Sequence, residues 1–188
     1  MKHLIKDIAT TQTGLFARPS EIGEAVYLQS KYFDDNGILK YELIPDLPLN
    51  QISDKHILRD GDVLFSAKGT KNFATVYECK YNVAVASTSF FVLRTIGSNI
   101  LPEYLSWFLN NPQTQRLIKD KARGTDIPSI RKTDIEDLEI PLPSIEKQRL
   151  IAELSNLAKK ETELRVQLTD LKKKIVEQKI LFNLKTII

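Results

Sequence analysis

The feature that most constrains this chain is an uninterrupted helical pattern near its carboxyl end. Residues 144–182 contain no proline or glycine, and Ser144, which directly follows Pro141-Leu-Pro, is a favourable helix N-cap. Apolar residues recur in alternating steps of four and three, the heptad pattern of a coiled coil. The apolar members of this seam are Leu150, Leu154, Leu157, Leu164, Leu168, Leu171, Ile175 and Phe182.

A helix over residues 144–182 would be about 55–60 Å long, because an α-helix rises about 1.5 Å per residue. A small domain cannot bury an apolar stripe of that length, so we expect this helix to pack against another helix. The partner is either a second copy of the chain or a different protein. Glu161 and Gln178 also occupy seam positions, where a polar residue either fixes the register or faces a gap in the packing.

The charge of the chain is unevenly distributed. The 188 residues suffice for one ordinary domain plus an appendage, and the net charge is +3. Residues 144–188 carry ten Lys/Arg and six Asp/Glu, a net of +4, whereas residues 1–143 carry 17 and 18, a net of −1. The amino-terminal part is therefore not basic overall, and a nucleic-acid site in it would have to be a local patch.

The cysteine content and the lack of long apolar segments predict the cellular compartment. Cys79 is the single cysteine, which excludes an internal disulfide and favours a reducing compartment. The amino terminus has no apolar signal region, and no window approaches 18 apolar residues. We therefore expect a cytoplasmic protein with no membrane segment.

Two parts with different folds are predicted: an α+β, β-rich globular domain at residues 1–143 and a long coiled-coil helix at residues 144–188. Apolar runs bounded by turn residues predict the strands of the domain. They lie at 25–28, 63–65, 74–77, 83–86, 90–93 and 138–142. Pro102 and Pro112 each stand at the first position of a predicted helix, where proline is favourable.

Four segments, in this order, resemble the specificity subunit of type I restriction–modification systems. They are Gly61-Asp62-Val-Leu-Phe, Leu101-Pro-Glu-Tyr-Leu-Ser-Trp-Phe-Leu, Ala122-Arg-Gly-Thr-Asp-Ile-Pro-Ser-Ile and Leu138-Glu-Ile-Pro-Leu-Pro-Ser-Ile-Glu-Lys-Gln-Arg-Leu-Ile. The last segment is the most specific. Members of that family usually carry two target recognition domains and two spacer helices, whereas this chain has one of each, so it looks like a half-length specificity subunit.

The resemblance implies that recognition domains read the two halves of a split double-stranded DNA sequence, while paired helices set the length of the unread spacer. It implies that methylation and cleavage belong to a DNA methyltransferase subunit and a restriction subunit, which bind S-adenosylmethionine, ATP and magnesium. This chain would then be non-catalytic and need no cofactor. Identical halves related by a two-fold axis would read an inverted repeat. We expect a homodimer through residues 144–182, antiparallel by resemblance, or pairing with another half-subunit.

Base edges in DNA are read by Arg, Lys, Asn and Gln, and phosphates are bound by Lys, Arg and helix N-termini. Residues of these types cluster in three polar segments of the predicted domain. The family resemblance transfers no DNA-contact residue, so the candidates depend on residue type and position alone. They are Arg18, Lys68, Lys71, Asn72, Arg123, Thr125, Arg131 and Lys132.

Two other functions are compatible with the sequence. Pro45-Asp46 followed by Glu78-Cys-Lys80 fits the loose signature of metal-dependent nucleases, in which two carboxylates hold Mg²⁺ and a lysine stabilises charge. The chain could instead be a coiled-coil adaptor that binds no DNA. His3, His56 and Cys79 lie too far apart in sequence for a zinc-ligand spacing, so no metal site is predicted from them.

Overall fold

The computed structural model describes residues 2–69, 72–121 and 129–185. The chain forms two compact units, Met1–Arg149 and Leu150–Ile188. The first unit contains all the strands and the shorter helices, and the second is the greater part of one long helix. Among the described residues, no helix is both long and apolar enough to cross a membrane.

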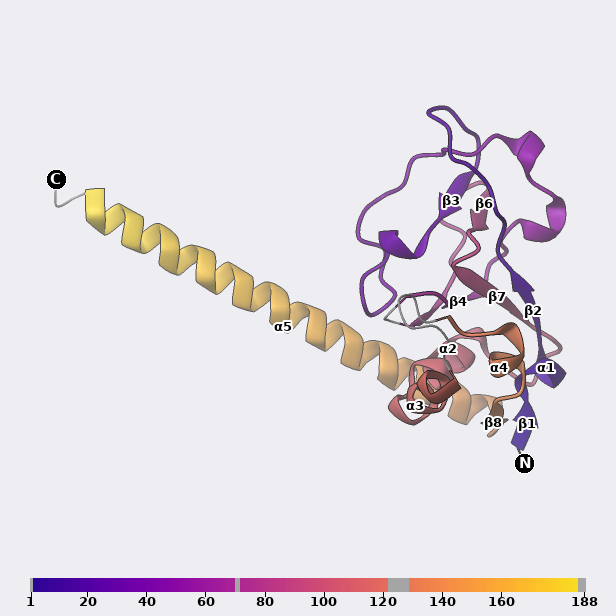
Figure 1. Ribbon diagram of the computed structural model, residues 1–188. Coiled ribbons are helices and arrows are strands. Elements are labelled where there is room, and N and C mark those ends of the chain that lie inside the picture. The colour runs from indigo at the N-terminus through magenta and orange to yellow at the C-terminus, as the bar shows by residue number, and fades with distance from the viewer. Residues whose placement is uncertain (1, 70–71, 122–128, 186–188) are drawn as a thin grey trace. The chain divides into compact units, whose positions relative to one another are not determined.

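A four-stranded antiparallel sheet in the order β2-β7-β4-β5 forms the centre of the first unit (Figure 1). Its strands are β2 (Ala9–Thr13), β7 (Phe90–Thr95), β4 (Val63–Ser66) and β5 (Ala74–Val76). Every residue of β4 is buried, because the strand lies between two others and both of its faces are covered. A strand covered on both faces needs apolar residues at successive positions, and the Val-Leu-Phe run supplies them.

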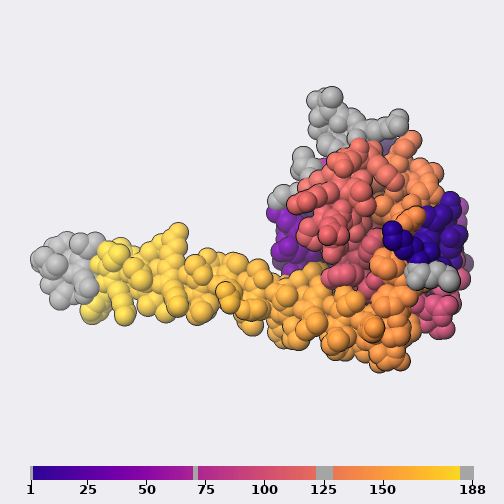
Figure 2. Space-filling model, turned by 90° about the horizontal axis from the view of Figure 1, so that it is seen from below, coloured from indigo at the N-terminus to yellow at the C-terminus, as the bar shows by residue number. Residues whose placement is uncertain are grey.

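Two smaller strand pairs complete the sheets. β3 (Val26–Leu28) and β6 (Ala84–Ala86) pair in parallel, and all six residues are buried between two apolar clusters. β1 (Lys2–Leu4) pairs antiparallel with β8 (Glu139–Pro141), and Lys2 forms a salt bridge with Glu139 at 3.0 Å. Figure 2 shows the indigo amino-terminal residues lying against the orange segment that contains β8.

Helices cover one end of the sheet. α2 (Pro102–Asn110) packs on β4 and β5, where the Asn110 side chain donates to the Ala74 carbonyl at 2.7 Å and accepts from the Ala74 N–H at 2.9 Å. α3 (Pro112–Lys121) and α4 (Lys132–Glu136) follow α2 in the chain, and the single-turn α1 (Ile5–Ile8) precedes β2. Short 3₁₀ turns occupy Ser30–Tyr32, Leu49–Gln51 and Asp54–His56.

An ion pair between the buried Asp62 and the partly exposed Arg94 ties the turn before β4 to the central sheet. Asp62 is 1% exposed and accepts from Arg94 Nε at 2.7 Å and Nη2 at 2.6 Å, and also from the Arg59 N–H at 2.8 Å. The hydrogen bonds with Asp62 raise the pKa of Arg94. Gly61, directly before Asp62, has φ +81°, a conformation that glycine adopts without steric cost. The Gly61-Asp62 pair is therefore structural.

The long helix α5 (Ile145–Lys185) has 41 residues and extends over about 62 Å. Its first turn belongs to the first unit and is held there by Gln148, which is fully buried. Gln148 Nε2 donates to the carbonyls of Asn99 at 2.8 Å and Pro143 at 2.9 Å, and Oε1 accepts from the Leu101 N–H at 3.0 Å. One amide side chain thus connects the start of the helix to two loops.

The predicted α+β fold followed by a long carboxyl-terminal helix is confirmed. Each strand predicted from an apolar run is present, within one or two residues of its predicted ends. Four strands and helices were not predicted: β1, β2, α1 and α4. β2 reads Ala-Thr-Thr-Gln-Thr, which has none of the aliphatic alternation by which strands are recognised.

Candidate nucleic-acid interface

Three segments that lie far apart in the sequence meet where β4 ends. The Ala67 N–H donates to the Ser89 carbonyl at 2.8 Å, and the Ala67 carbonyl accepts from the Ile130 N–H at 2.9 Å. Lys68 forms an isolated antiparallel bridge with Ser129. The backbone therefore places the segment that begins at Lys68 beside the one that leads to Arg131 and Lys132, which were predicted separately as DNA-contacting segments.

A surface hollow of about 420 Å³ opens beside Lys68, and we call it the Lys68 hollow. Its polar groups are two lysines, an amide and a series of hydroxyls, with one exposed aromatic ring among the lining residues. The lining residues are Phe16, Ala17, Pro19, Tyr27, Gln29, Ser30, Lys31, Lys68, Ser87, Thr88 and Ser89. Lysine ammonium groups and side-chain hydroxyls are among the donors that proteins use for phosphate oxygens.

The hydroxyl groups in the Lys68 hollow are held in place by one another. Ser87 Oγ and Ser89 Oγ are 2.7 Å apart, and Ser89 Oγ also accepts from the Ser30 N–H at 3.3 Å. This network joins the end of β3 to the turn between β6 and β7. The hydroxyls are therefore positioned before any ligand arrives.

Charge is locally uncompensated at the Lys68 hollow. Lys31 and Lys68 are exposed and line it, and Arg18 is exposed between the lining residues Ala17 and Pro19. Among the residues that the structure describes, no acidic side chain lines the hollow. Within the described residues, none of these three cations forms a salt bridge, although the first 143 residues are close to neutral overall. The near-neutral domain thus has a local basic patch at this hollow.

Arg131 and Lys132, in contrast, are already paired with carboxylates of their own helix. Arg131 donates from Nε at 3.0 Å and Nη2 at 2.7 Å to Asp134, which is nearly buried and also accepts from the Arg131 N–H. The side-chain hydrogen bonds from Arg131 lower the pKa of Asp134. Lys132 Nζ lies 3.3 Å from Glu136. These two cations begin and stabilise α4, and their charge is less available to a ligand.

Asn72 also makes a structural contact. Its side-chain amide donates to the Ser66 carbonyl at 2.8 Å and so ties the residues before β5 to the end of β4. Lys71, Arg123 and Thr125, which the sequence also predicted as contacts, lie outside the described residues. Of the predicted set, Lys68 lines the hollow, and Arg18 is exposed in the chain between the lining residues Ala17 and Pro19.

Several residues of the Lys68 hollow were missed by the sequence analysis. Lys31, Ser87, Ser89 and Phe16 come from three segments whose proximity depends on the β3–β6 pairing and on the bridge between Leu15 and Ser87. The run Ser87-Thr88-Ser89 in a β-rich chain was the one local signal, because three adjacent hydroxyl residues suit both a tight turn and phosphate binding.

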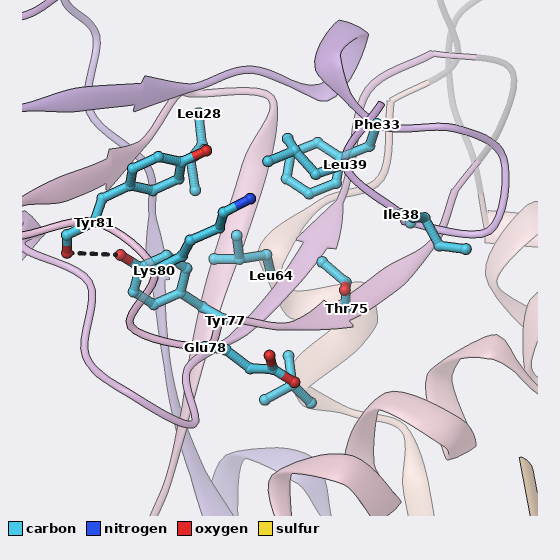
Figure 3. A pocket seen from close by; sticks show the side chains of 12 residues that line it. Leu28, Phe33, Ile38, Leu39, Leu64, Thr75, Tyr77, Glu78, Lys80 and Tyr81 are labelled. Atoms are coloured by element: carbon cyan, nitrogen blue, oxygen red, sulfur yellow. Dashed lines mark hydrogen bonds between the residues drawn. The ribbon is translucent and has the colours of Figure 1, made fainter. Parts of the chain in front are cut away.

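The residues of the nuclease pattern are not assembled into a common site. Asp46 accepts from the Tyr27 N–H at 3.0 Å and lines a hollow with Tyr41 and Glu42. Glu78 and Lys80 line a different, largely apolar hollow, where Figure 3 shows their charged ends pointing in different directions. Across residues 2–69, 72–121 and 129–185, no cluster of three His, Cys, Asp or Glu side chains could hold a metal ion.

The predicted seam residues of α5 are exposed to solvent in the single chain. Their exposed fractions run from 52% at Leu168 to 72% at Phe182. The other members of this set are Leu150, Leu154, Leu157, Leu164, Leu171 and Ile175. The seam residue Glu161 accepts from Arg165 Nη2 at 2.7 Å along its own helix. An apolar stripe of this length in water is stable only when another surface covers it.

The domain presents exposed cations without salt bridges beside ordered hydroxyls at strand ends, and it is joined to a helix with a heptad stripe. These features are typical of the class of macromolecular recognition modules. The particular family follows from comparison with known proteins. A family model described as the type I restriction modification DNA specificity domain matches residues 23–172. The chain belongs to that family.

Similar proteins agree with this assignment. A putative type I restriction enzyme MjaX specificity subunit from Methanocaldococcus jannaschii is 30% identical over 121 residues, which are 62% of this chain and 28% of the relative. The S subunit of a type I restriction–modification system from M. genitalium superposes with a TM-score of 0.59 at 19% identity, over 93% of this chain and 42% of that one. The HsdS subunit from Thermoanaerobacter tengcongensis superposes with a TM-score of 0.61 at 22% identity, over 93% of this chain and 46% of that one.

The structural likenesses show the fold, and the family model shows the family. The chain spans less than half the length of each of these three relatives. The arrangement of one recognition domain followed by one long helix is thus found within proteins that are more than twice as long.

Proposed function

We propose that this chain is a sequence-specific DNA-recognition subunit of a type I restriction–modification complex that reads one half of a bipartite target. In this proposal residues 1–143 bind double-stranded DNA, and the helix at 144–188 sets the spacing. Family membership supports the proposal, and the observation that carries it to particular residues is the Lys68 hollow, where exposed cations without salt-bridge partners meet ordered hydroxyls.

The Lys68 hollow is proposed as the phosphate-binding part of the interface. Lys31 and Lys68 would neutralise phosphates, and Ser87 and Ser89 would donate hydroxyl hydrogen bonds to the same backbone. Arg18, which is exposed in the chain between the lining residues Ala17 and Pro19, would reach toward base edges. Arg131 and Lys132 would play a secondary part, because Asp134 and Glu136 already offset their charge.

The exposed seam of α5 is proposed to pair with the same helix of a second copy, or with that of another half-subunit. Support comes from the eight half-exposed apolar residues and from the family resemblance, since full-length members carry two domains and two helices. An antiparallel pair would place two recognition domains at opposite ends of a rod, and a rod of fixed rise per residue is a ruler for DNA.

The proposed partners follow from the same assignment. A DNA methyltransferase subunit and a restriction subunit would carry the catalysis, and this chain would remain non-catalytic and need no cofactor of its own. Such a complex acts on DNA in the cytoplasm, which is the proposed location of the chain.

Salt-dependent binding to duplex DNA tests the recognition proposal. The full chain is titrated with a duplex selected from a random library, in the presence of the methyltransferase subunit, at several salt concentrations. We expect Lys31→Ala and Lys68→Ala each to reduce the slope of log affinity against log salt by about one. Lys55→Ala, which removes an exposed lysine outside the Lys68 hollow, should leave the slope unchanged.

The coiled-coil adaptor without DNA binding makes the opposite prediction. In that case neither the wild-type complex nor any lysine variant binds duplex with a salt-dependent affinity. If the slope of log affinity against log salt falls equally for Lys55→Ala and Lys68→Ala, the proposal is also contradicted. The binding would then depend on the net charge of the chain and not on the Lys68 hollow.

Sedimentation of the full chain at micromolar concentration tests the pairing. We expect a dimer for the wild type and a monomer for the double variant Leu164→Glu, Leu168→Glu, since two carboxylates on the seam cannot be buried against a partner helix. Val166→Glu is the matched control: Val166 is 57% exposed but lies opposite the seam. A wild-type chain that sediments as a monomer would refute the homodimer.

A further inference from the structure

Phe16 is the aromatic residue whose position the proposed DNA contacts do not explain. Its side chain is 76% exposed, yet it lines the Lys68 hollow together with Lys31 and Lys68. An exposed phenyl ring gains nothing from burial in the fold. An aromatic side chain that projects beside uncompensated cations is a common feature of surfaces that bind nucleic acid.

The backbone on both sides of Phe16 is fixed by one buried hydroxyl. Tyr27 Oη donates to the Leu15 carbonyl at 2.8 Å and accepts from the Ala17 N–H at 3.3 Å. Burial raises the pKa of Tyr27, so the hydroxyl keeps the proton that it donates. The Leu15 N–H in turn donates to the Ala86 carbonyl at 2.8 Å. Phe16 is therefore presented to solvent by an ordered loop.

The residues that follow Phe16 suit a particular kind of DNA contact. Proteins that bind the minor groove combine cationic side chains with apolar wedges, often Phe or Pro, which insert between base pairs and unstack them. The segment Phe16-Ala17-Arg18-Pro19 contains such a ring, an exposed arginine and a proline within four residues. The lysines and hydroxyls of the Lys68 hollow would hold the adjacent phosphates.

We propose that Phe16 is a wedge that enters the minor groove and partly unstacks one base step of the target. The inference rests on the proposed DNA-recognition function and adds to it a deformation of the duplex. A wedge makes recognition depend on how easily that step unstacks, so base pairs that no side chain touches contribute to specificity. Pyrimidine–purine steps, which unstack most easily, are the expected position of insertion.

Fluorescence of 2-aminopurine tests the wedge, because the base analogue becomes brighter when it loses its stacking neighbours. The full chain with its methyltransferase subunit binds a series of selected duplexes, each with 2-aminopurine at a different position. We expect a several-fold increase at one step. Phe16→Ala should abolish this increase and weaken binding roughly tenfold, with an unchanged salt slope because no phosphate contact is lost.

Two matched variants make the result specific. Phe16→Leu keeps an apolar wedge and should retain part of the fluorescence increase. Ile44→Ala removes an equally exposed apolar side chain, 82% exposed, from a different hollow and should change neither affinity nor fluorescence. Urea unfolding of the variants should match that of the wild type, since neither side chain is buried.

The outcomes separate the two proposals. If the wild type shows no salt-dependent binding to duplex, DNA recognition and the wedge are both overturned. If it binds but no position brightens, or the increase is the same in Phe16→Ala, the wedge alone is overturned and recognition stands.

Discussion

Replacement of Gln148 by Glu probes the junction between the recognition domain and the long helix. The substitution keeps the shape of the side chain and the oxygen that accepts from the Leu101 N–H. It removes both N–H donors, so that a carboxylate would face the carbonyl oxygens of Asn99 and Pro143 in a site with no solvent exposure. The folded state can avoid a buried unpaired charge only by protonating the new carboxyl group.

The expected cost follows from the loss of one donor and from that protonation. A protonated carboxyl group restores one of the two donated hydrogen bonds. Loss of the other lowers the free energy of unfolding by about 1 kcal/mol. Holding a glutamic acid neutral at pH 7, when its unfolded pKa is about 4.3, costs about 3.7 kcal/mol at 1.36 kcal/mol per unit. The variant should therefore be less stable by about 4–5 kcal/mol at pH 7. At pH 5 the protonation cost falls to about 1 kcal/mol, so the deficit should be about 2 kcal/mol.

Urea unfolding at pH 5, 6 and 7 measures these differences, with the fluorescence of Trp107, the single tryptophan, as the probe. Trp107 lies in α2 and stacks on Tyr104 with ring centroids 5.4 Å apart, so its emission reports on the first unit. Gln113→Glu adds the same charge at an exposed position of α3 and should cost little at any pH. A deficit below about 1 kcal/mol at pH 7, or one that does not shrink as the pH falls, would refute the assignment of Gln148 as a buried double donor.

Three further predictions concern the ion pairs and the helix. Asp62→Asn should destabilise the domain by about 1.5–3 kcal/mol in urea unfolding, because it removes the charged acceptor of hydrogen bonds from Arg94 and the Arg59 N–H, while the Arg94 side chain, 32% exposed, stays partly hydrated; a cost within experimental error would contradict this role of Asp62. The advantage of the wild type over Asp134→Asn should be full above about pH 4 and shrink as the pH falls further, because Arg131 lowers the pKa of Asp134 in the folded state alone. An advantage that stays constant down to pH 2 would contradict this. Insertion of seven residues after Leu164 keeps the heptad phase and lengthens α5 by about 10.5 Å, so the selected DNA target should gain about 3 base pairs of spacer with unchanged half-sites. An unchanged spacer would exclude the helix as the ruler.

The elements that depend on local sequence were predictable, and those that depend on distant partners were not. Val63–Ser66 and Phe90–Thr95 are strands because a continuous run of apolar, β-favouring residues needs a buried position in a sheet, whatever its neighbours are. Lys2–Leu4 has no such pattern of its own. It is a strand because it pairs with Glu139–Pro141, more than 130 residues later in the chain.

The candidate site shows the same division. Lys68 was predicted correctly as a surface cation beside a buried strand, because a polar loop after such a strand must reach solvent. Nothing local indicated that Arg131 would be held by Asp134, although the i, i+3 spacing at a helix start allowed it. Lys31 and Phe16 join Lys68 only through the tertiary pairing of β3 with β6, and no reading of the segments one at a time could have brought them together.

The pairing of β1 with β8 has a consequence for the evolution of such chains. The first strand of the domain lies beside its last one, so the backbone arrives and departs at neighbouring points. Recombination at those two points could therefore exchange the whole recognition domain for one with a different DNA preference. The path of the backbone and the helix that follows would stay the same.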